Sequence, residues 1–342
     1  GADVVSGGEL LKALKAGIKP KKIVFSGVGK SEDELKIAIN KKILLINCES
    51  ESEAKLVNKL AKKLKKNVSI GFRLNPNVDA KTHKNISTGK ADDKFGLTRK
   101  KLVSFCNQID KLRGLKLEAI SVHIGSQITN LKPFKKAFQI IYDLINDLRG
   151  LGHKIKHVDL GGGLGVTYSD DDNVPTFKEY ASLIQSIFGN LNIEVYIEPG
   201  RLLVANSGLL VTRVVDIKTT SQKTFVIVDA AMNDFIRPTL YNSYHEILPV
   251  KNNLGTSNKL YDIVGPICET GDFLGIDFNL QETKKNEVLV IMTCGAYGSV
   301  MRSNYNSRPS AAEVFIYNKE EILLRKREEI DQLLKLDIIP NL

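Results

Sequence analysis

Three apolar segments of this chain each end in residues that can take part in catalysis or hold a phosphate group. The segments are Ala119–Ser126, which contains His123, Val158–Gly163, which ends in three glycines, and Val195–Arg201, which contains Glu198. Imidazole, bare backbone amides, carboxylate and guanidinium together suit a phosphorylated, ring-containing cofactor better than a metal ion or a hydride carrier.

The glycines at 161–163 leave backbone amides open to a phosphate, although such a run also occurs where a tight turn needs positive φ. Arg201 favours the phosphate interpretation, because guanidinium matches phosphate and carboxylate geometry. Glu198 is suited to pair with a protonated ring nitrogen, which deepens the ring's capacity as an electron sink. The alternative for Glu198 is a structural salt bridge with Arg201.

His123 can stack on a flat ring or transfer protons, and the alternative is a hydrogen-bonded core histidine. The other histidines show no spacing that indicates a partner; they are His83, His153, His157 and His245.

Three segments in the second half of the chain also carry reactive or binding side chains. They are Asp234–Tyr241 with Arg237, Gly265–Asp272 with Cys268 and Glu269, and Cys294–Gly298 with Tyr297. Each alone is weak evidence, since a buried cysteine usually serves packing. Their polarity within a sheet-like region indicates a binding partner or a second site.

With 342 residues, 42% hydrophobic and 26% charged, the chain has the composition of a globular protein large enough for two domains. No apolar run approaches the roughly 18 residues of a membrane span, and no signal peptide leads the chain. We therefore expect no membrane partner and a cytoplasmic location. The opening residues Gly1–Val5 read as a buried strand, so we expect an N-terminal segment to precede them.

The net charge is +10, and Lys59–Lys66 is the most basic stretch. Leucines at 56, 60 and 64 place these lysines on the solvent face of an amphipathic helix. Because no aromatic or arginine residues interleave with them, we expect no nucleic-acid partner, whereas the positive field favours an anionic substrate or cofactor. The four cysteines lack paired-ligand spacing, so we expect no metal site and reduced thiols.

The first 200 residues alternate strands and helices. The predicted strands are Asp3–Ser6, Lys22–Ser26, Ile43–Asn47, Val68–Leu74, Glu118–Ile124, Lys156–Leu160 and Glu194–Ile197. The predicted helices are Gly8–Ala16, Glu32–Asn40, Glu51–Lys66, Arg99–Leu112, Pro133–Leu151 and Phe177–Phe188. Four helices open with the capping-box pattern of Ser or Thr followed three residues later by Glu, at Ser6, Ser31, Ser50 and Thr176.

This alternation predicts right-handed crossovers and a parallel sheet. We predict a (β/α)8 TIM-type barrel that lacks its first strand, because the G-x-G-x-x-G pattern of an open Rossmann sheet fails at Val166. In such a barrel the three clusters meet at the C-terminal rim. After about residue 205 strand-like runs follow without long helices, so residues 1–205 are predicted as the barrel domain and 206–342 as a β-rich domain. Glu320–Leu336 reads as a terminal amphipathic helix.

With these residues in view, the chain resembles the diaminopimelate decarboxylases, fold-type III pyridoxal-phosphate enzymes of lysine biosynthesis, over nearly its whole length. The matching segments are Gly1–Glu9, Asn85–Gly89, Lys94–Gly96, His123–Ser126, Gly161–Gly163, Glu198–Arg201, Arg237–Tyr241, Gly265–Glu269 and Tyr297. The resemblance implies conversion of meso-2,6-diaminopimelate to L-lysine with pyridoxal 5′-phosphate as cofactor.

For the cofactor, the resemblance implies that Gly162, Gly163 and Arg201 hold the phosphate region, that Glu198 holds the pyridine nitrogen and that His123 stacks on the ring. The other cofactor-binding residues of these motifs are Ser126, Pro199, Gly200 and Tyr297.

For the substrate, the resemblance implies carboxylate binding by three residues, recognition of the distal amino acid end by Glu269, and contact with Tyr297. The three are Arg201, Arg237 and Tyr241. Cys268 joins His123 as a catalytic candidate, because it would deliver the proton that replaces the lost carboxylate. In the family Cys268 and Glu269 reach the pocket of the partner subunit, so a homodimer with shared active sites is implied.

One departure from the family concerns the Schiff-base lysine, which lies in a Tyr-x-x-Lys-Ala motif on the first barrel strand. That motif is absent here, and Lys30, at a strand end, matches a different family position. We therefore interpret the chain as an N-terminally shortened form, expected to be unstable and inactive on its own.

Two alternatives stay open. Decarboxylases of the same fold act on ornithine, arginine or carboxynorspermidine, but those substrates end in a cation and predict no counterpart of Arg237 and an Asp in place of Glu269. A non-catalytic homologue without the anchoring lysine is the other alternative, and the presence of Glu198, Cys268 and Tyr297 argues against it. Alanine racemase is disfavoured, because its second-domain tyrosine motif is not apparent.

Overall fold

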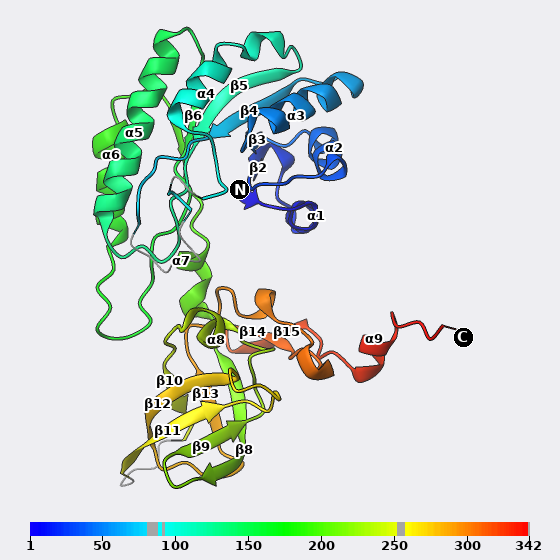
Figure 1. Cartoon of the computed structure of the whole chain (residues 1–342), viewed down its shortest axis with the longest axis vertical. Helices are drawn as coiled ribbons and strands as arrows, with labels where there is room; N and C mark the ends of the chain where they lie inside the picture. Colours follow the sequence, from blue (N-terminus) through cyan, green and yellow to red (C-terminus); the bar gives the residue numbers. More distant parts are fainter. Residues whose placement is uncertain (81–87, 91–92, 252–256, 341–342) are drawn as a thin grey trace. The chain divides into compact units, whose positions relative to one another are not determined.

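The structure is a computed structural model that describes residues 1–80, 88–90, 93–251 and 257–340. It divides into two compact units, residues 1–165 with 173–200 and residues 166–172 with 201–342 (Figure 1). The segment 166–172 thus groups with the second unit although it directly follows the glycine cluster. The domain boundary at residue 205 stays a prediction. His83 and residues 85–87 of the Asn85–Gly89 match lie outside the described residues.

The first unit contains a sheet of seven parallel strands in chain order. The strands are β1 (Ala2–Val4), β2 (Ile23–Phe25), β3 (Leu45–Cys48), β4 (Val68–Arg73), β5 (Leu115–Ser121), β6 (His157–Asp159) and β7 (Glu194–Tyr196). The connecting helices are α1 (Gly7–Lys15), α2 (Glu32–Lys41), α3 (Glu51–Lys63), α4 (Arg99–Cys106), α5 (Leu131–Gly150) and α6 (Phe177–Phe188). Figure 1 shows these helices around a curved sheet, so the predicted parallel, barrel-type architecture is confirmed.

The longest helix, α5, shows why the helices pack against the strands. Its buried residues recur three and four apart, which gives one apolar stripe along the helix. They are Phe134, Ala137, Phe138, Ile141, Leu144, Ile145 and Leu148. Phe134 also meets Tyr180 of α6 edge-on, with ring centroids 5.1 Å apart, so α5 and α6 are joined by aromatic packing.

The four predicted caps are present, but only two are reciprocal capping boxes. Each Ser or Thr hydroxyl accepts from the amide of the Glu three residues later. Glu34 and Glu179 return the hydrogen bond to the cap residue, which completes the box. Glu9 and Glu53 instead accept from the residue before the cap, so these carboxylates fix the end of the preceding loop.

In the first unit, element ends lie within three residues of their predicted positions except in one helix, and the shift of one strand bears on the site. The helix predicted as Arg99–Leu112 ends at Cys106 and continues as a short 3-10 turn at Ile109–Lys111. The strand predicted as Glu118–Ile124 runs from Leu115 to Ser121, because its neighbour β6 is short and offers its last acceptor, the Asp159 carbonyl, to the amide of Val122. His123 therefore lies just beyond the strand.

The second unit contains a mixed sheet of six strands in the order β10, β13, β8, β9, β11, β12. Their bounds are β8 (Leu210–Thr219), β9 (Thr224–Val228), β10 (Ile247–Pro249), β11 (Asn258–Val264), β12 (Phe273–Gln281) and β13 (Val288–Ile291). Two short helices, α7 (Arg201–Val204) and α8 (Arg237–Tyr241), carry the arginines singled out by the sequence. A separate core, with Val226, Ile263 and Leu289 fully buried, supports this sheet.

The terminal helix predicted over Glu320–Leu336 is wrong. The segment forms strand β15 (Glu320–Arg325), paired antiparallel with β14 (Glu313–Tyr317), and then a short helix α9 (Ile330–Leu334). Asn318 and Lys319 both have positive φ, as a type I′ hairpin turn requires. Aromatic or aliphatic residues occupy 314–317 before the turn and 322–324 after it. The turn and the β-forming residues outweigh the helical charge pattern.

Within the described ranges, every helix is too short or too polar to cross a bilayer.

Candidate active site

Three consecutive strands of the first unit carry the predicted chemistry at their C-terminal ends. His123 follows β5, the glycines 161–163 follow β6 and Glu198 follows β7. Because these strands are neighbours and parallel, their ends lie at one edge of the sheet. The clusters that contain His123, the three glycines and Glu198 therefore lie at the same edge of the sheet.

The glycine segment is held against both neighbouring loops. Gly162 N donates to His123 Nδ1 at 3.1 Å, and the Gly161 carbonyl accepts from Glu198 N at 2.8 Å. A Cβ added at Gly162 would lie 2.1 Å from the Glu198 carbonyl oxygen, and one at Gly163 would lie 2.1 Å from the Gly125 oxygen. Backbone therefore approaches backbone here, which no larger residue permits.

Glu198 belongs to a group of three carboxyl groups together with Asp159 and Asp3. Desolvation, and then the charges of Asp159 and Asp3, raise the pKa of Glu198 well above its usual range. Desolvation also raises the pKa of Asp159, which accepts from Asn47 Nδ2 at 2.9 Å and from Gly161 N at 3.0 Å. Glu198 is therefore the protonated partner in its hydrogen bond with Asp159.

Asp3 is the third member of the group. The surrounding barrel atoms displace water from the Asp3 carboxyl group, and this desolvation, together with the charge of Asp159, raises the pKa of Asp3 to about 7. Solvent still reaches part of the residue. No ion pair to Lys or Arg is made by any of the three carboxyl groups within the described residues. The cluster therefore suits a cationic ligand.

The His123 ring is neutral at physiological pH. Desolvation and the Arg73 charge lower the pKa of His123 to about 3. Since Nδ1 accepts from Gly162 N, the ring proton lies on Nε2. The glycine segment thus sets both the tautomer and the orientation of this imidazole.

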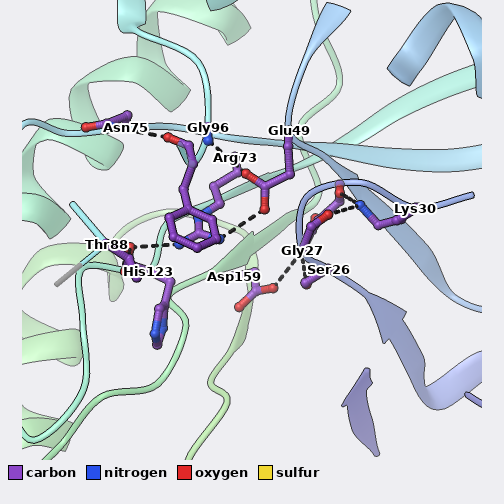
Figure 2. A network of polar contacts seen from close by, with 12 residues as sticks. Ser26, Gly27, Lys30, Glu49, Arg73, Asn75, Thr88, Gly96, His123 and Asp159 are labelled. Atoms are coloured by element: carbon purple, nitrogen blue, oxygen red, sulfur yellow. Dashed lines mark hydrogen bonds and ion pairs between the residues drawn. The ribbon is translucent and has the colours of Figure 1, made fainter. Parts of the chain in front are cut away.

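Buried ionic contacts hold the backbone of His123 (Figure 2). Arg73 Nη1 pairs with Glu49 Oε1 at 3.0 Å, and Arg73 Nη2 donates to the His123 carbonyl at 3.1 Å. Thr88 Oγ1 donates to the same carbonyl at 2.9 Å. The second Glu49 oxygen accepts from Gly96 N at 2.8 Å, so the loop that follows β4 is tied to the same pair.

Lys30 is fully used by structural contacts. Its ammonium group donates to the carbonyl oxygens of Gly27 and Asn47 at 2.6 and 2.7 Å and pairs with Glu53 Oε1 at 2.7 Å. The Lys30 side chain is only 1% exposed. These contacts support the sequence interpretation that Lys30 does not replace the family's anchoring lysine.

The second unit gathers two buried arginines around Tyr168. Arg201 Nη1 donates to the Tyr168 hydroxyl at 2.5 Å, and Arg237 Nη2 donates to the same oxygen at 3.3 Å. Tyr297 lies under the Arg201 guanidinium at 4.9 Å, and Tyr241 lies under that of Arg237 at 5.7 Å. The predicted substrate residues Arg201, Arg237, Tyr241 and Tyr297 are therefore brought together in this unit.

Tyr297 also has a strained backbone, with φ of +60°. The neighbouring Gly295 packs so closely that an added Cβ would lie 1.8 Å from the Val204 carbonyl oxygen. Such strain is retained where surrounding contacts fix it, and here it aims a partly exposed phenol at Arg201.

Cys268 and Glu269 lie in an exposed turn before β12. The Asp272 carboxylate builds this turn by accepting from Ile267 N and Met232 N, each at 2.7 Å. Among the four cysteines, all of which the structure describes, only Cys268 is exposed. Cys294 is packing, because it is buried and its thiol donates to the Ile291 carbonyl.

The sequence left several residues of these clusters without a role. Asp159 and Asp3 lie inside quoted motifs, so their positions beside reactive residues were a usable signal. Arg73 is the last residue of the buried strand β4, and Glu49 directly follows the buried strand β3. Tyr168 and His245 come from segments far apart in sequence and had no such signal.

The first unit fits pyridoxal phosphate by the chemistry of its donors. Glycines 161–163 form a cradle that a Cβ would fill, and the carboxyl cluster around Glu198 has no paired cation among the described residues. A protonated pyridine ring supplies such a cation. The neutral His123 ring provides an uncharged face. Nowhere in the described ranges do three or more His, Cys, Asp or Glu side chains form a group suited to a metal ion.

Comparison with known proteins places the chain in a family. The family model "Pyridoxal-dependent decarboxylase, pyridoxal binding domain" matches residues 1–205. A diaminopimelate decarboxylase of Aquifex aeolicus is 44% identical over 340 residues, 99% of this chain and 81% of that protein. One from Vibrio cholerae is 45% identical over the same shares of the two chains.

A solved structure agrees with these sequences. Diaminopimelate decarboxylase of Helicobacter pylori, complexed with L-lysine, superposes with a TM-score of 0.94 at 41% identity, covering 98% of this chain and 84% of that one. With relatives of this identity over nearly its whole length, the chain belongs to the diaminopimelate decarboxylase family of pyridoxal-dependent enzymes.

Proposed function

We propose that this protein decarboxylates meso-2,6-diaminopimelate to L-lysine with pyridoxal phosphate as cofactor. The observation that carries the substrate assignment is Arg237. Its side chain is 5% exposed and contacts His245, Tyr168 and Tyr241, with no carboxylate paired to it among the described residues. A buried guanidinium without an anion is costly, so it favours a ligand that brings one. Diaminopimelate brings a carboxylate at its distal end, where ornithine and arginine bring a cation.

Glu198, hydrogen-bonded to Asp159, would hold the ring nitrogen of bound pyridoxal phosphate. When bound, pyridoxal phosphate supplies a protonated ring that takes up the electron pair released as carbon dioxide leaves. A cation beside Glu198 opposes the repulsion from Asp159 and so lowers the raised pKa of Glu198. The carboxyl pair thus favours the protonated form of the ring.

His123 and the glycine segment position the flat part of the site. Since the pKa of His123 is lowered to about 3, its ring adds no positive charge beside the ring nitrogen. Gly162 and Gly163, with Ser126, Pro199 and Gly200, line the loops that approach the cofactor. Arg73 and Thr88 fix the His123 backbone, and the hydrogen bond from Gly162 N to Nδ1 fixes the orientation of its ring.

The residues of the second unit bind the substrate and complete the reaction. Arg201, Arg237 and Tyr241 bind carboxylate, and Glu269 receives the distal ammonium group. The Cys268 thiol donates its proton to the carbon that has lost carbon dioxide, and the thiolate regains a proton from solvent. The exposure of Cys268 supports this role, because a thiol packed in a core could not exchange its proton.

The test is carbon dioxide release by the purified full-length protein, which includes the family's anchoring lysine and is loaded with pyridoxal phosphate. We expect release from meso-diaminopimelate, none from ornithine or arginine, and a loss of kcat of about 100-fold or more in Cys268→Ala. Cys294→Ala is the matched control, since that thiol is buried and outside the proposed site. Turnover of ornithine without turnover of diaminopimelate would reverse the substrate assignment, and no turnover of any of the three would favour a non-catalytic homologue.

We further propose a homodimer in which Cys268 and Glu269 of one subunit serve the barrel site of the other. Complementation tests this directly. Glu198→Gln and Cys268→Ala are each inactive alone, but a mixed population regains about a quarter of wild-type activity if each site draws on both subunits of a symmetric dimer. Sites built within single subunits would leave the mixture inactive, and a monomer in sedimentation would contradict the proposal outright.

A further inference from the structure

The Tyr168 hydroxyl lies between two guanidinium groups. Its oxygen accepts from Arg201 at 2.5 Å and from Arg237 at 3.3 Å, which uses both lone pairs. The guanidinium carbons lie 5.9 and 5.4 Å from the Tyr168 ring centre, so both cations also contact the aromatic face. The hydroxyl hydrogen meets no acceptor within the described residues. It therefore stays available to an incoming anion.

Arg237 is oriented from its other side by His245. Arg237 Nε donates to His245 Nε2 at 3.2 Å, and His245 Nδ1 donates to the Met292 carbonyl at 2.9 Å. These two contacts place the proton of the neutral His245 ring on Nδ1, because the Nε–H of arginine can only donate and a carbonyl oxygen can only accept. Phe235 and Tyr168 meet the imidazole edge-on, with ring centroids 4.6 and 5.0 Å away. His245 is 1% exposed and has one orientation that satisfies all four neighbours.

The local charges explain why this support is needed. Two buried guanidinium groups repel each other, and desolvation and the Arg201 charge both lower the pKa of Arg237. His245 adds no third positive charge, because desolvation lowers its pKa to about 4. The Tyr168 phenol accepts from both guanidinium groups and the neutral His245 imidazole accepts from Arg237, so both groups are oriented by uncharged partners. The positive charge of Arg237 is kept for a ligand.

We propose that Tyr168 is a substrate-binding residue that donates its hydroxyl hydrogen to a substrate carboxylate held by Arg201 and Arg237, and that His245 is a positioning residue that orients Arg237. This inference rests on the proposed function and deepens it, because it names the groups that distinguish a substrate with a distal carboxylate from one without. It adds a tyrosine and a histidine to the arginines that make this discrimination.

The experiment compares two inhibitors of the holoenzyme that differ by one carboxylate. L-Lysine retains the distal carboxylate, and pentane-1,5-diamine lacks it. We expect Tyr168→Phe to reduce the ratio of the diamine inhibition constant to the lysine inhibition constant about tenfold, the effect of losing a hydrogen bond to a charged group. The KM for diaminopimelate should rise by a similar factor, and kcat should change less. Tyr317→Phe, which removes an exposed phenol on β14, should leave the ratio unchanged.

His245 is tested by two replacements. His245→Leu removes the acceptor for Arg237 Nε and should reduce the same ratio about tenfold, whereas His245→Gln keeps an acceptor at that reach and should restore most of it. Equal effects of leucine and glutamine would mean that the imidazole only fills space and would overturn its positioning role. If His245→Leu does not fold, glutamine against alanine at this position makes the same comparison.

The two levels of the proposal fail in different ways. A wild-type enzyme that releases no carbon dioxide from diaminopimelate overturns the proposed function. A wild-type enzyme that does so, with a Tyr168→Phe variant that keeps the wild-type ratio, overturns only the role of Tyr168. A Tyr168→Phe variant that weakens both inhibitors equally also overturns it, because the loss is then structural.

Discussion

Gly162→Ala should separate the glycine segment from the end of β7. The added Cβ would lie 2.1 Å from the Glu198 carbonyl oxygen and 3.0 Å from its carbonyl carbon, and both atoms belong to the backbone. No side chain can rotate away to make room. The loop after β6 or the one after β7 must therefore shift by about 1 Å or more to restore ordinary contact distances. Either shift disturbs the hydrogen bond from Gly162 N to His123 Nδ1.

The cost follows from two effects. Forcing a methyl group into a packed site typically costs about 1–3 kcal/mol, and the weakened hydrogen bond to His123 costs about 1 kcal/mol more. We expect the free energy of unfolding to fall by about 2–4 kcal/mol. Cofactor affinity should fall as well, because the shift moves Glu198.

Equilibrium urea unfolding of the variant and of Gly150→Ala checks this reasoning. Gly150 ends helix α5, and an added Cβ there meets no heavy atom within 4 Å. Alanine at 150 should stabilise the protein by up to about 1 kcal/mol through its helix propensity. Opposite signs for the two substitutions are expected. If Gly162→Ala unfolds at the same urea concentration as Gly150→Ala, the close backbone approach does not exist in the protein.

Three further predictions concern burial and charge. Lys30→Met leaves Glu53 without its cation in a largely buried site and should lower the free energy of unfolding in urea by about 3 kcal/mol. The control Lys36→Met breaks only exposed pairs and should lower it by less than about 0.5 kcal/mol. Equal losses in the two variants would contradict the contribution of the buried pair. The pKa of Asp3 is raised to about 7 in the folded protein, so the folded state binds this proton more tightly than the unfolded state does. The free energy of unfolding of the wild-type protein without cofactor should therefore fall, relative to that of Asp3→Asn, as the pH rises from about 4 to 7. A constant difference between the two unfolding curves would show that Asp3 titrates normally. In thiol titration of the native protein, Cys268 should react quickly and Cys48, Cys106 and Cys294 only after unfolding, and Cys268→Ala should abolish the fast phase.

Much of the first unit could be predicted from sequence because its signals are local. Apolar runs, the period of α5 and the hydroxyl–Glu caps each involve residues within a few positions of one another. Parallel strands then bring their C-terminal ends to one edge whatever the details of packing, so His123, Glu198 and the glycines were expected to lie at one rim.

The contacts that tune the site were beyond sequence reasoning. Arg73 reaches the carbonyl of His123 across 50 positions, and Tyr168 reaches Arg237 across 69. Such pairs depend on side-chain packing, which no periodicity reports. The helix wrongly predicted over Glu320–Leu336 had a different cause, because alternating charges there imitate an amphipathic pattern while Asn318 and Lys319 form the turn of a hairpin.

The Glu53 carboxylate has a genetic consequence. One of its oxygens pairs with the Lys30 ammonium group and the other accepts a hydrogen bond from the amide of Glu49. The backbone amide of Glu53 donates to the Ser50 hydroxyl, which caps helix α3. A mutation at position 30 therefore leaves a negative charge without its cation, and truncating the Glu53 side chain to remove that charge would also loosen the loop that carries Glu49. Suppressors of such a mutation should arise as Glu53→Gln, which removes the charge and keeps an acceptor for the amide, so positions 30 and 53 should change together as the lineage diverges.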